Sequence, residues 1–413
     1  MWNAASDGRV RRARARMEPF SSQVVYTWVL SASLITASKY RKIYSEQLAQ
    51  IGCQLGQENV LEDSRSIGLS SLATAFPPNV LEQSSASAIA KKVFSGRMHD
   101  FERLEGVFKN SGIDRRYAAM PLEWYLSQRG WDERSEAFLT VATELFIAAA
   151  KQAADEAGLL MQEIDAVVFV SSTGIATPSI EARAAKLLNL RADVMRVPIF
   201  GLGCAGGVTG LGIAAQLASA RPGTNVLLVV VELCTLAFRL DKFTPANVVA
   251  TALFGDGAAA AILRKGIETK VTIEGALQHM WPDTLGIMGW NVDSTGFEVV
   301  FDRAIPPFVR RNIKPVMVEF LEKWGIQQAN VPDLFRFHPG GTKVIEAMEN
   351  ALDFLPGSLD IERDILRDYG NMSSPTALFV LQRALAREGS SQLVLSALGP
   401  GFTASSVLLK RAA

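Results

Sequence analysis

The sequence predicts an α/β fold in which buried strands alternate with helices. Three observations predict it: short apolar runs rich in β-branched residues, amphipathic stretches of helical period between them, and a similar order of elements in both halves of the chain. Residues 166–170 form one such apolar run, and the long amphipathic stretch before it ends at Gly158. The composition of this run is typical of a strand covered on both faces.

The individual elements follow from these patterns in chain order. In the first half we expect strands at residues 66–75, 164–171, 194–200, 226–232 and 257–263, and helices at 84–94, 135–157, 179–188 and 208–220. The first strand stops at Phe76-Pro77-Pro78 because proline cannot continue the ladder of hydrogen bonds. In the second half we expect strands at 334–338, 392–398 and 404–409, and helices at 342–353 and 374–387. Two similar halves predict a site at their junction, where loops of both can meet.

Composition excludes several classes of protein. The 413 residues carry 42 basic and 42 acidic side chains, and this zero net charge argues against nucleic-acid binding. With 48% hydrophobic and 20% charged residues, the chain is not a disordered one. We find no apolar run of the about 18 residues that span a bilayer, so stable membrane insertion is not expected. Cys53, Cys204 and Cys234 are too few for a disulfide framework and indicate a cytoplasmic protein.

Residues 1–64 differ from the rest of the chain. They hold a cluster of arginines, Arg9 to Arg16, followed by a mostly apolar stretch at 24–37. A secretory signal or a transit peptide has this order. The alternative that we favour is an N-terminal extension, disordered or locally helical, or a start codon placed before Met17. The predicted organisation is therefore an extension at 1–64, a first half at 65–268 and a second half at 269–413.

The first candidate motif surrounds a cysteine. Cys204 lies in Gly201-Leu202-Gly203-Cys204-Ala205-Gly206-Gly207, between a predicted strand and a predicted helix. At a helix N-terminus the macrodipole favours thiolate over thiol, and the glycines allow a substrate to approach closely. The alternative is a small buried cysteine packed among glycines.

Two further motifs follow strands of the second half. His338 begins His338-Pro339-Gly340-Gly341 at the end of a strand, where α/β folds present site residues, although a lone histidine is also common in cores. Asn371 lies in Gly370-Asn371-Met372-Ser373-Ser374-Pro375, where Asn371 or Ser373 could instead cap the next helix.

A cysteine, a histidine and an asparagine at three such turns form a coherent set for acyl transfer. The imidazole takes the thiol proton, the thiolate attacks a thioester, and the histidine and asparagine N–H groups stabilise the developing oxyanion or enolate. A cysteine protease uses the same groups with the asparagine orienting the histidine, but no flanking sequence of the papain type is present. With only three histidines, a histidine-rich metal site is not expected, and no metal is assigned.

These motifs together resemble the chalcone synthase-like family of type III polyketide synthases. The resemblance extends over residues 66–411 and includes Leu253-Phe254-Gly255-Asp256-Gly257 and the late loop Gly399-Pro400-Gly401. It implies the thiolase fold, with two pseudo-symmetric βαβαβ halves in five αβαβα layers, and a homodimer. In style the chain is closest to bacterial alkylresorcinol and alkylpyrone synthases, partly through Met288-Gly289-Trp290.

The resemblance also implies roles for individual residues. Cys204 is the expected acyl acceptor, His338 and Asn371 hold the malonyl thioester, and Phe254 is the expected gate between the coenzyme A tunnel and the cavity. Further cavity positions are Cys234, Thr173, Val299 and Ser373, and Lys109 is a weak candidate for binding coenzyme A phosphates. The expected substrates are acyl-CoA and malonyl-CoA, with no cofactor.

The expected product is an alkylpyrone or alkylresorcinol made from a long-chain acyl-CoA. Cys234 and Ala237 stand where plant relatives usually have threonines, so the cavity wall should be more apolar and suit an aliphatic starter. Two alternatives remain. One is a β-ketoacyl synthase III-like condensing enzyme, although its histidine is usually followed by Gln-Ala-Asn. The other is a synthase that uses malonyl-CoA alone and makes tetrahydroxynaphthalene or phloroglucinol. A catalytically silent binding partner is disfavoured because the three motifs are intact.

Overall fold

Nine strands form one continuous sheet in the part of the chain that the computed structural model describes, residues 67–98, 101–327 and 331–412. Their spatial order is β11 (Phe335–Phe337), β12 (Gln392–Gly399), β13 (Thr403–Arg411), β8 (Val271–Met280), β1 (Ile67–Ala75), β7 (Asp256–Lys265), β6 (Asn225–Leu233), β4 (Ala166–Val170) and β5 (Met195–Ile199). The extension expected at residues 1–64 lies outside the described residues.

The sheet contains the same four-stranded unit twice. In the first half β4 pairs with β6 in parallel, β6 with β7 antiparallel, and β7 with β1 antiparallel. In the second half β11, β12, β13 and β8 repeat this series with the same directions. The two units join where β1 pairs with β8. The pseudo-symmetric halves expected from the sequence are therefore confirmed, with β5 as an added edge strand on the first.

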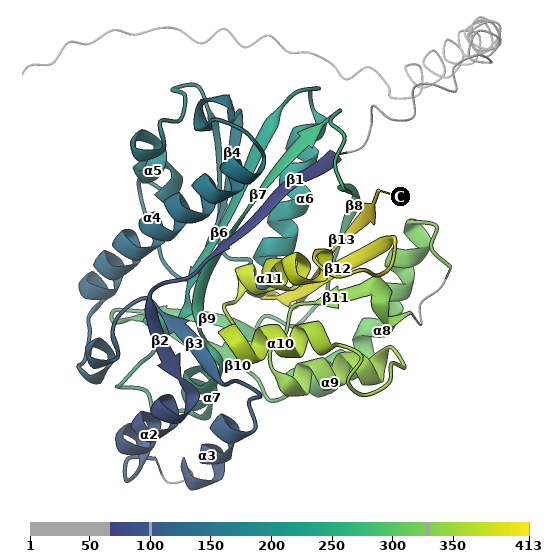
Figure 1. Ribbon diagram of the computed structural model, residues 1–413. Coiled ribbons are helices and arrows are strands. Elements are labelled where there is room, and N and C mark those ends of the chain that lie inside the picture. Colours follow the sequence, from purple (N-terminus) through teal and green to yellow (C-terminus); the bar gives the residue numbers. More distant parts are fainter. Residues whose placement is uncertain (1–66, 99–100, 328–330, 413) are drawn as a thin grey trace, which may run out of the picture. The chain divides into compact units, whose positions relative to one another are not determined.

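Helices separate the molecule into five layers (Figure 1). In the middle, α6 (Gly206–Ser219) and α11 (Ser374–Leu385) pack on each other and on strands of both halves. On the outer face of the first half lie α4 (Trp131–Glu156) and α5 (Ile180–Leu188). The outer face of the second half is covered by α8 (Ile305–Lys323) and α9 (Thr342–Ala351), and α10 (Asp360–Tyr369) packs beside α11 and β3. This is the expected αβαβα arrangement.

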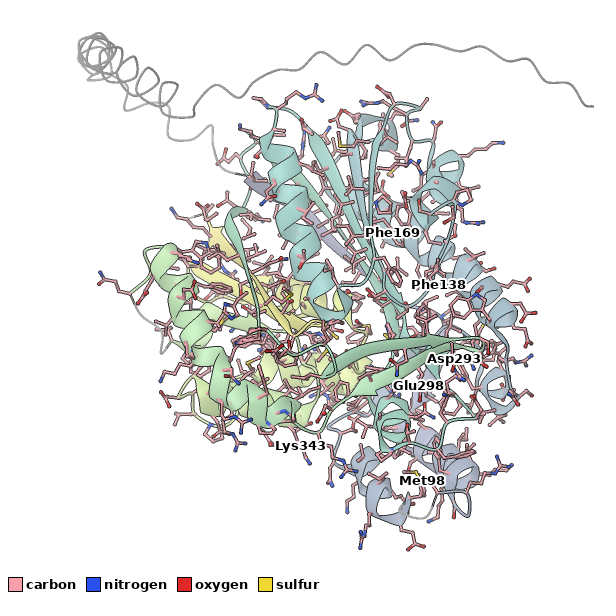
Figure 2. The ribbon with its side chains drawn as sticks, turned by 180° about the vertical axis from the view of Figure 1, so that it is seen from behind. Met98, Phe138, Phe169, Asp293, Glu298 and Lys343 are labelled. Carbon is pink, nitrogen blue, oxygen red and sulfur yellow. The ribbon has the colours of Figure 1, made fainter. Side chains whose placement is uncertain are left out.

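Alternation along the strands explains the layering. On β4, Val168 and Val170 face the central core with α6, whereas Val167 and Phe169 face the outer core with α4. Phe169 and Phe138 of α4 lie close together in this outer core (Figure 2). Because both faces of β4 are buried, its sequence is a continuous apolar run without polar alternation.

The helix α4 begins at Trp131, earlier than the predicted Ser135. The carboxylate of Glu133 accepts the backbone N–H of Gly130 at 3.1 Å, which satisfies one of the free donors that precede the first turn. By length and composition α4 could cross a membrane, but more than half of its most apolar stretch is buried in the protein. A core helix of a soluble protein has the same features.

A group of smaller elements gathers at one end of the sheet, the lower end in Figure 1. They are β2 (Asn79–Glu82), α2 (Gln83–Phe94), α3 (Phe101–Lys109), β3 (Arg115–Ala118), α7 (Pro245–Leu253), β9 (Met288–Asp293) and β10 (Gly296–Phe301). Short 3₁₀ turns accompany the main elements: η3 (Leu122–Leu126), η4 (Met161–Glu163), η5 (Gly203–Ala205), η6 (Cys234–Ala237) and η7 (Pro332–Leu334). Of this group the sequence patterns predict α2 alone, and the group surrounds the cavities described below.

Candidate active site

The three chemically active residues of the sequence motifs line one cavity. Cys204 lies in η5 directly before α6, Asn371 lies three residues before the start of α11, and His338 follows β11. The cavity has about 380 Å³ of empty space, and we refer to it as the catalytic cavity. Its other lining residues are Met288, Phe301, Gly340, Val344, Met348, Ser396, Ala397 and Leu398. Cys204 and Asn371 precede the two equivalent central helices, so the duplication of the fold brings them together.

Two glycines allow this close approach. A Cβ atom on Gly207 would lie 2.3 Å from the carbonyl oxygen of Ser374, so only glycine lets the start of α6 reach the start of α11. Gly203 has a φ of +46°, and a Cβ there would lie 2.6 Å from Cδ of Pro400 in the late glycine loop. The turn from Gly203 to Gly207 is therefore shaped by two distant segments of the second half.

The cysteine and the histidine are both neutral in this arrangement. Burial raises the pKa of the Cys204 thiol to about 12, with a smaller opposing effect of a hydrogen bond with Ser373. Burial lowers the pKa of His338 to about 3. Desolvation in this cavity therefore opposes the thiolate that the position at a helix N-terminus favours. Neither ring nitrogen of His338 has a hydrogen-bond partner among the described residues, so one of them can accept the thiol proton.

The side chain of Asn371 is oriented by neighbouring backbone. Its Oδ1 accepts the N–H of Ser373 at 2.8 Å, and its Nδ2 donates to the carbonyl of Gly340 at 3.2 Å. An amide has two N–H bonds, so the second can point to a ligand. The capping alternative is not supported: Ser373 precedes α11, but its side chain accepts no hydrogen bond from the helix. The predicted proline in the first turn, Pro375, is present.

A buried glutamate that the sequence analysis missed joins the loops around the catalytic cavity. The carboxylate of Glu232 accepts from Ser172 N at 2.9 Å, from Thr173 Oγ1 at 2.8 Å and from Ser374 Oγ at 2.8 Å. Ser374 Oγ also lies 2.5 Å from the carbonyl of Gly203, next to Cys204. Burial raises the pKa of Glu232 to about 7. An acidic residue inside the apolar run of β6 was the available sequence signal.

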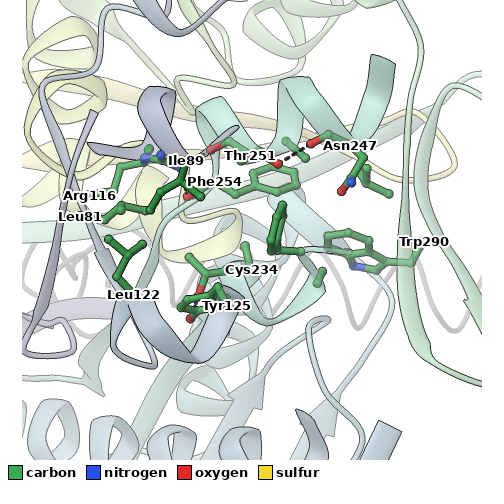
Figure 3. Close-up of a pocket in the computed structure, with 16 residues that line it drawn as sticks. Leu81, Ile89, Arg116, Leu122, Tyr125, Cys234, Asn247, Thr251, Phe254 and Trp290 are labelled. Atoms are coloured by element: carbon green, nitrogen blue, oxygen red, sulfur yellow. Dashed lines mark hydrogen bonds between the residues drawn. The ribbon is translucent and has the colours of Figure 1, made fainter. Parts of the chain in front are cut away.

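A second cavity lies beside Phe254, and we call it the apolar cavity (Figure 3). It has about 590 Å³ of empty space and is lined by Leu81, Ala86, Ile89, Arg116, Leu122, Tyr125, Cys234, Thr235, Ala237, Phe238, Asn247, Ala250, Thr251, Phe254, Trp290 and Val299. Most of these side chains are apolar. The cavity therefore suits an aliphatic or aromatic group better than a charged one.

Phe254 and the hairpin of β9 and β10 connect the two cavities. Phe254 forms an isolated parallel bridge with Asn371, which lines the catalytic cavity. On the hairpin, Met288 and Phe301 are paired and line the catalytic cavity. Trp290 and Val299, paired two residues further along the strands, line the apolar cavity. The ring of Trp290 meets that of Phe254 edge to face at 5.9 Å.

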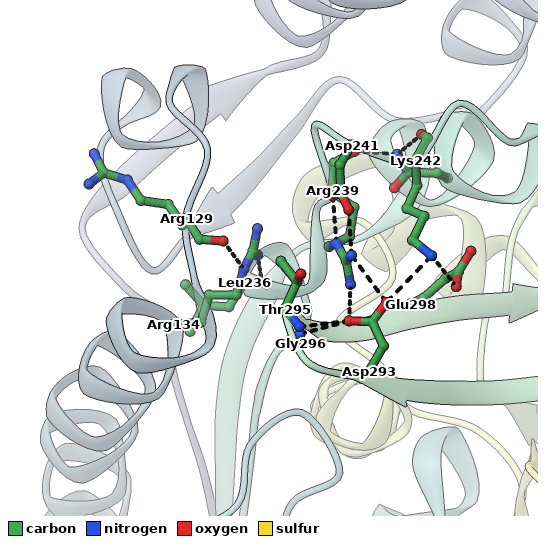
Figure 4. Close-up of polar contacts among 11 residues, drawn as sticks. Arg129, Arg134, Leu236, Arg239, Asp241, Lys242, Asp293, Thr295, Gly296 and Glu298 are labelled. Carbon is green, nitrogen blue, oxygen red and sulfur yellow. Dashed lines mark hydrogen bonds and ion pairs between the residues drawn. The ribbon is translucent and has the colours of Figure 1, made fainter.

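Charged residues hold this hairpin against the segment after η6 (Figure 4). The buried guanidinium of Arg239 donates to Asp241 and, at 2.9 Å, to Asp293 at the end of β9. Lys242 donates to Glu298 of β10 at 2.9 Å. We call these five charged residues the hairpin clamp: Arg239, Asp241, Lys242, Asp293 and Glu298.

The remaining predicted positions fall in different places. Cys234 and Val299 line the apolar cavity, as does Phe254. Thr173 lines neither the catalytic cavity nor the apolar cavity. Its hydroxyl donates to Glu232 and accepts from Leu233 N at 2.8 Å. Ser373 lies beside the sulfur of Cys204. Lys109 is the exposed last residue of α3 and lines neither of the two cavities.

Comparison with known proteins connects this geometry to a family. The chain matches the models of the chalcone and stilbene synthases, the N-terminal domain over residues 58–266 and the C-terminal domain over residues 272–413. It is 36% identical over 367 residues to 1,3,6,8-tetrahydroxynaphthalene synthase of Streptomyces peucetius subsp. caesius, which covers 86% of this chain and 96% of the relative. It is 30% identical to type III polyketide synthase A of Arabidopsis thaliana, over 83% of this chain and 92% of the relative.

Solved structures give the same result. The crystal structure of 1,3,6,8-tetrahydroxynaphthalene synthase from Streptomyces coelicolor A3(2) superposes with a TM-score of 0.79 and 26% identity, over 84% of this chain and 99% of that one. PKS-I from the brown alga Ectocarpus siliculosus gives a TM-score of 0.79 and 27% identity, over 85% and 100%. The chain therefore belongs to the chalcone and stilbene synthase family, the type III polyketide synthases, which are acyl-transferring condensing enzymes.

Proposed function

We propose that this enzyme loads an acyl group from acyl-CoA onto Cys204, extends it with malonyl-CoA and cyclises the product to an alkylpyrone or alkylresorcinol. The observation that carries the proposal is the pair of adjoining cavities. One holds Cys204, His338 and Asn371 together, and the other offers an apolar space next to Phe254.

Loading begins with neutral groups. The Cys204 thiol gives its proton to a free nitrogen of His338, and the sulfur attacks the thioester carbonyl of acyl-CoA. The carbon–sulfur bond to coenzyme A breaks, and the departing thiolate takes the proton from the imidazolium. The acyl group then remains on Cys204, and His338 is neutral again.

Extension uses the same histidine as a hydrogen-bond donor. Malonyl-CoA loses CO₂, and the electron pair of the broken bond forms an enolate. The enolate oxygen accepts hydrogen bonds from the N–H groups of His338 and Asn371. The enolate carbon attacks the acyl carbonyl on Cys204, and the cysteine sulfur leaves. Transfer of the lengthened chain back to Cys204 repeats the cycle. Every step moves acyl groups and protons, so the proposal includes no metal and no redox cofactor.

The apolar cavity is the proposed place of the starter chain. Cys234, Ala237 and Val299 contribute apolar or weakly polar wall, and Phe254 stands as the gate toward the catalytic cavity. Burial of a methylene there is worth about 0.8 kcal/mol, which favours long aliphatic starters over short ones. Lys109 is kept as the candidate for the coenzyme A phosphates.

The second candidate product is 1,3,6,8-tetrahydroxynaphthalene, made from malonyl-CoA alone. Three relatives of this chain carry that name, one of them at 36% identity. In this case the apolar cavity would hold the growing polyketide rather than an alkyl starter.

Mass spectrometry of the products decides between these proposals. The purified enzyme receives malonyl-CoA alone, and then malonyl-CoA with acyl-CoAs of graded chain length. We expect pyrones or resorcinols that carry the added acyl chain. Product from malonyl-CoA alone supports the naphthalene alternative, and a single condensation that stops at a β-ketoacyl thioester overturns both in favour of a β-ketoacyl synthase III-like enzyme.

The proposed assembly is a homodimer in the cytoplasm. Within the described part of the chain, the edge strand β5 pairs on one side only, and large apolar side chains near it are exposed: Ile175, Met195 and Phe200. An exposed strand edge with apolar side chains promotes aggregation unless a partner covers it. We expect sedimentation to give a dimer, and a charged residue in place of Phe200 to give a monomer. A wild-type monomer at micromolar concentration would contradict the proposal.

A further inference from the structure

We propose that Arg116 is a positioning residue that holds Phe254 and Asn371 in their relative places. Arg116 lies on β3 and is 1% exposed. Its Nη1 donates to the carbonyl of Thr251 at 2.8 Å and to the carbonyl of Phe254 at 2.6 Å. These carbonyls belong to the last turn of α7 and to the residue that ends it, so the guanidinium satisfies acceptors that the helix leaves free.

Two glycines make room for the stem of Arg116. A Cβ atom on Gly370 would lie 2.6 Å from Cγ and 2.7 Å from Cδ of Arg116, and one on Gly255 would lie 3.3 Å from its Cβ. Gly370 directly precedes Asn371, and Gly255 directly follows Phe254. The stem therefore passes between the two segments that carry the proposed gate and the proposed enolate donor.

The same two segments are joined to each other by backbone hydrogen bonds. The N–H of Gly255 donates to the carbonyl of Asn371 at 3.0 Å, and the N–H of Asn371 donates to the carbonyl of Leu253 at 2.9 Å. Arg116 thus closes a three-part junction of β3, the end of α7 and the turn before α11. A change at Arg116 would therefore disturb the positions of both Phe254 and Asn371.

Stability alone does not explain a cation at this place. Nε and Nη2 of Arg116 have no hydrogen-bond partner among the described residues, and such unsatisfied buried donors cost free energy. Burial lowers the pKa of Arg116 to about 10, partly offset by the charge of Asp256, so the side chain stays charged at neutral pH. Apolar residues of similar volume often stabilise a core at least as well as a buried charged residue does. The directional bonds to Thr251 and Phe254 are what a guanidinium adds.

The test rests on the proposed function and separates its two half-reactions. Acyl loading of Cys204 is followed by intact-protein mass spectrometry, and malonyl-CoA decarboxylation by CO₂ release. For Arg116→Met we expect loading to be little changed and the kcat of decarboxylation to fall about 100-fold, because misplacing a catalytic group costs that much. Arg116→Lys, which can restore one of the two hydrogen bonds, should recover part of the loss.

Arg411→Met is the matched control. Arg411 also donates to two helix-end carbonyls, those of Ala384 at 2.7 Å and Leu385 at 3.2 Å, but at the far end of α11. Arg411→Met should leave the ratio of the loading rate to the decarboxylation rate as in the wild type. Parallel loss of both half-reactions in the Arg116 variants, or no change in their ratio, would overturn the inference.

Hydrogen exchange gives a readout that does not need activity. In Arg116→Lys the amides of Gly255 and Asn371 should exchange faster than in the wild type, while exchange in α4 stays unchanged. Faster exchange throughout the protein, or an unchanged exchange rate at the amides of Gly255 and Asn371, would contradict a positioning role. If the wild type performs neither half-reaction, the proposed function is wrong, and the exchange experiment still decides the role of Arg116.

Discussion

Arg239 and Asp293 form the ion pair that anchors the hairpin of β9 and β10 to the segment after η6. The distance between Nη1 and Oδ1 is 2.9 Å, and the Arg239 side chain is 2% exposed. Asp293 also accepts the N–H groups of Thr295 and Gly296, so one carboxylate orders the hairpin turn and joins the clamp. The walls of both cavities therefore depend on a contact that touches neither of them.

The first prediction concerns this clamp. Arg239→Met should destabilise the protein by about 3 kcal/mol, because it removes the buried guanidinium that joins Asp241 to Asp293 and leaves only Lys242 beside Asp293. It should also broaden the product distribution, since Trp290 and Val299 move with the hairpin. Chemical denaturation and product profiling measure the two effects. Lys323→Met, which breaks the exposed pair with Glu319, is the control, and equal effects of both variants would contradict the prediction.

The second prediction concerns the proposed nucleophile. Cys204→Ala should abolish product formation and acyl loading while the melting temperature stays near that of the wild type. Malonyl-CoA decarboxylation should persist, because His338 and Asn371 are intact and this step needs no bond to sulfur. Intact-protein mass spectrometry and CO₂ release separate the two steps. Product formation that survives in this variant would remove Cys204 from the nucleophile role.

The third prediction concerns the proposed gate. Phe254→Leu removes the edge-to-face contact with Trp290 and widens the connection between the cavities. We expect a shift in chain length or number of extensions, measured by liquid chromatography with mass spectrometry. Phe320→Leu is the control, since Phe320 is buried on α8 and lines neither cavity. An unchanged product pattern in Phe254→Leu would argue against gating.

The fourth prediction is a pH dependence of stability. Glu362 of α10 accepts the N–H of Phe337 at 2.9 Å, directly before His338, and burial raises its pKa to about 7. A raised carboxyl pKa means that the folded state binds more protons than the unfolded state between the two pKa values. Stability from this group is therefore present at low pH and is lost as pH rises through about 4.5 to 7.

Glu362→Gln removes that loss and keeps an oxygen that can accept from Phe337. Its free energy of unfolding should equal that of the wild type near pH 4 and exceed it by up to about 3 kcal/mol near pH 8. Urea titrations at several pH values measure the difference. A difference that does not depend on pH, or that grows toward acid, would show that Glu362 is ionised throughout in the folded protein.

The sequence by itself determined the α/β class, the duplicated halves and the place of Cys204, His338 and Asn371 at strand and helix ends. These are local properties: β-branched runs, helical periodicity, and glycine or proline at turns act over a few residues. The predicted strands and helices of the two halves accordingly agree with the observed ones within a few residues at each end.

Only the tertiary structure decided what surrounds those residues. Arg116 and Asp293 act through partners far away in the chain, and the sequence around them does not distinguish a buried ionic contact from a solvated charge. Glu232 stands out inside an apolar strand, but its partners Thr173 and Ser374 are also distant in the chain. The protonation of Cys204 is the clearest example. Its position before a helix favours a thiolate, but desolvation in the catalytic cavity, which segments of the second half help to enclose, raises the pKa of the thiol.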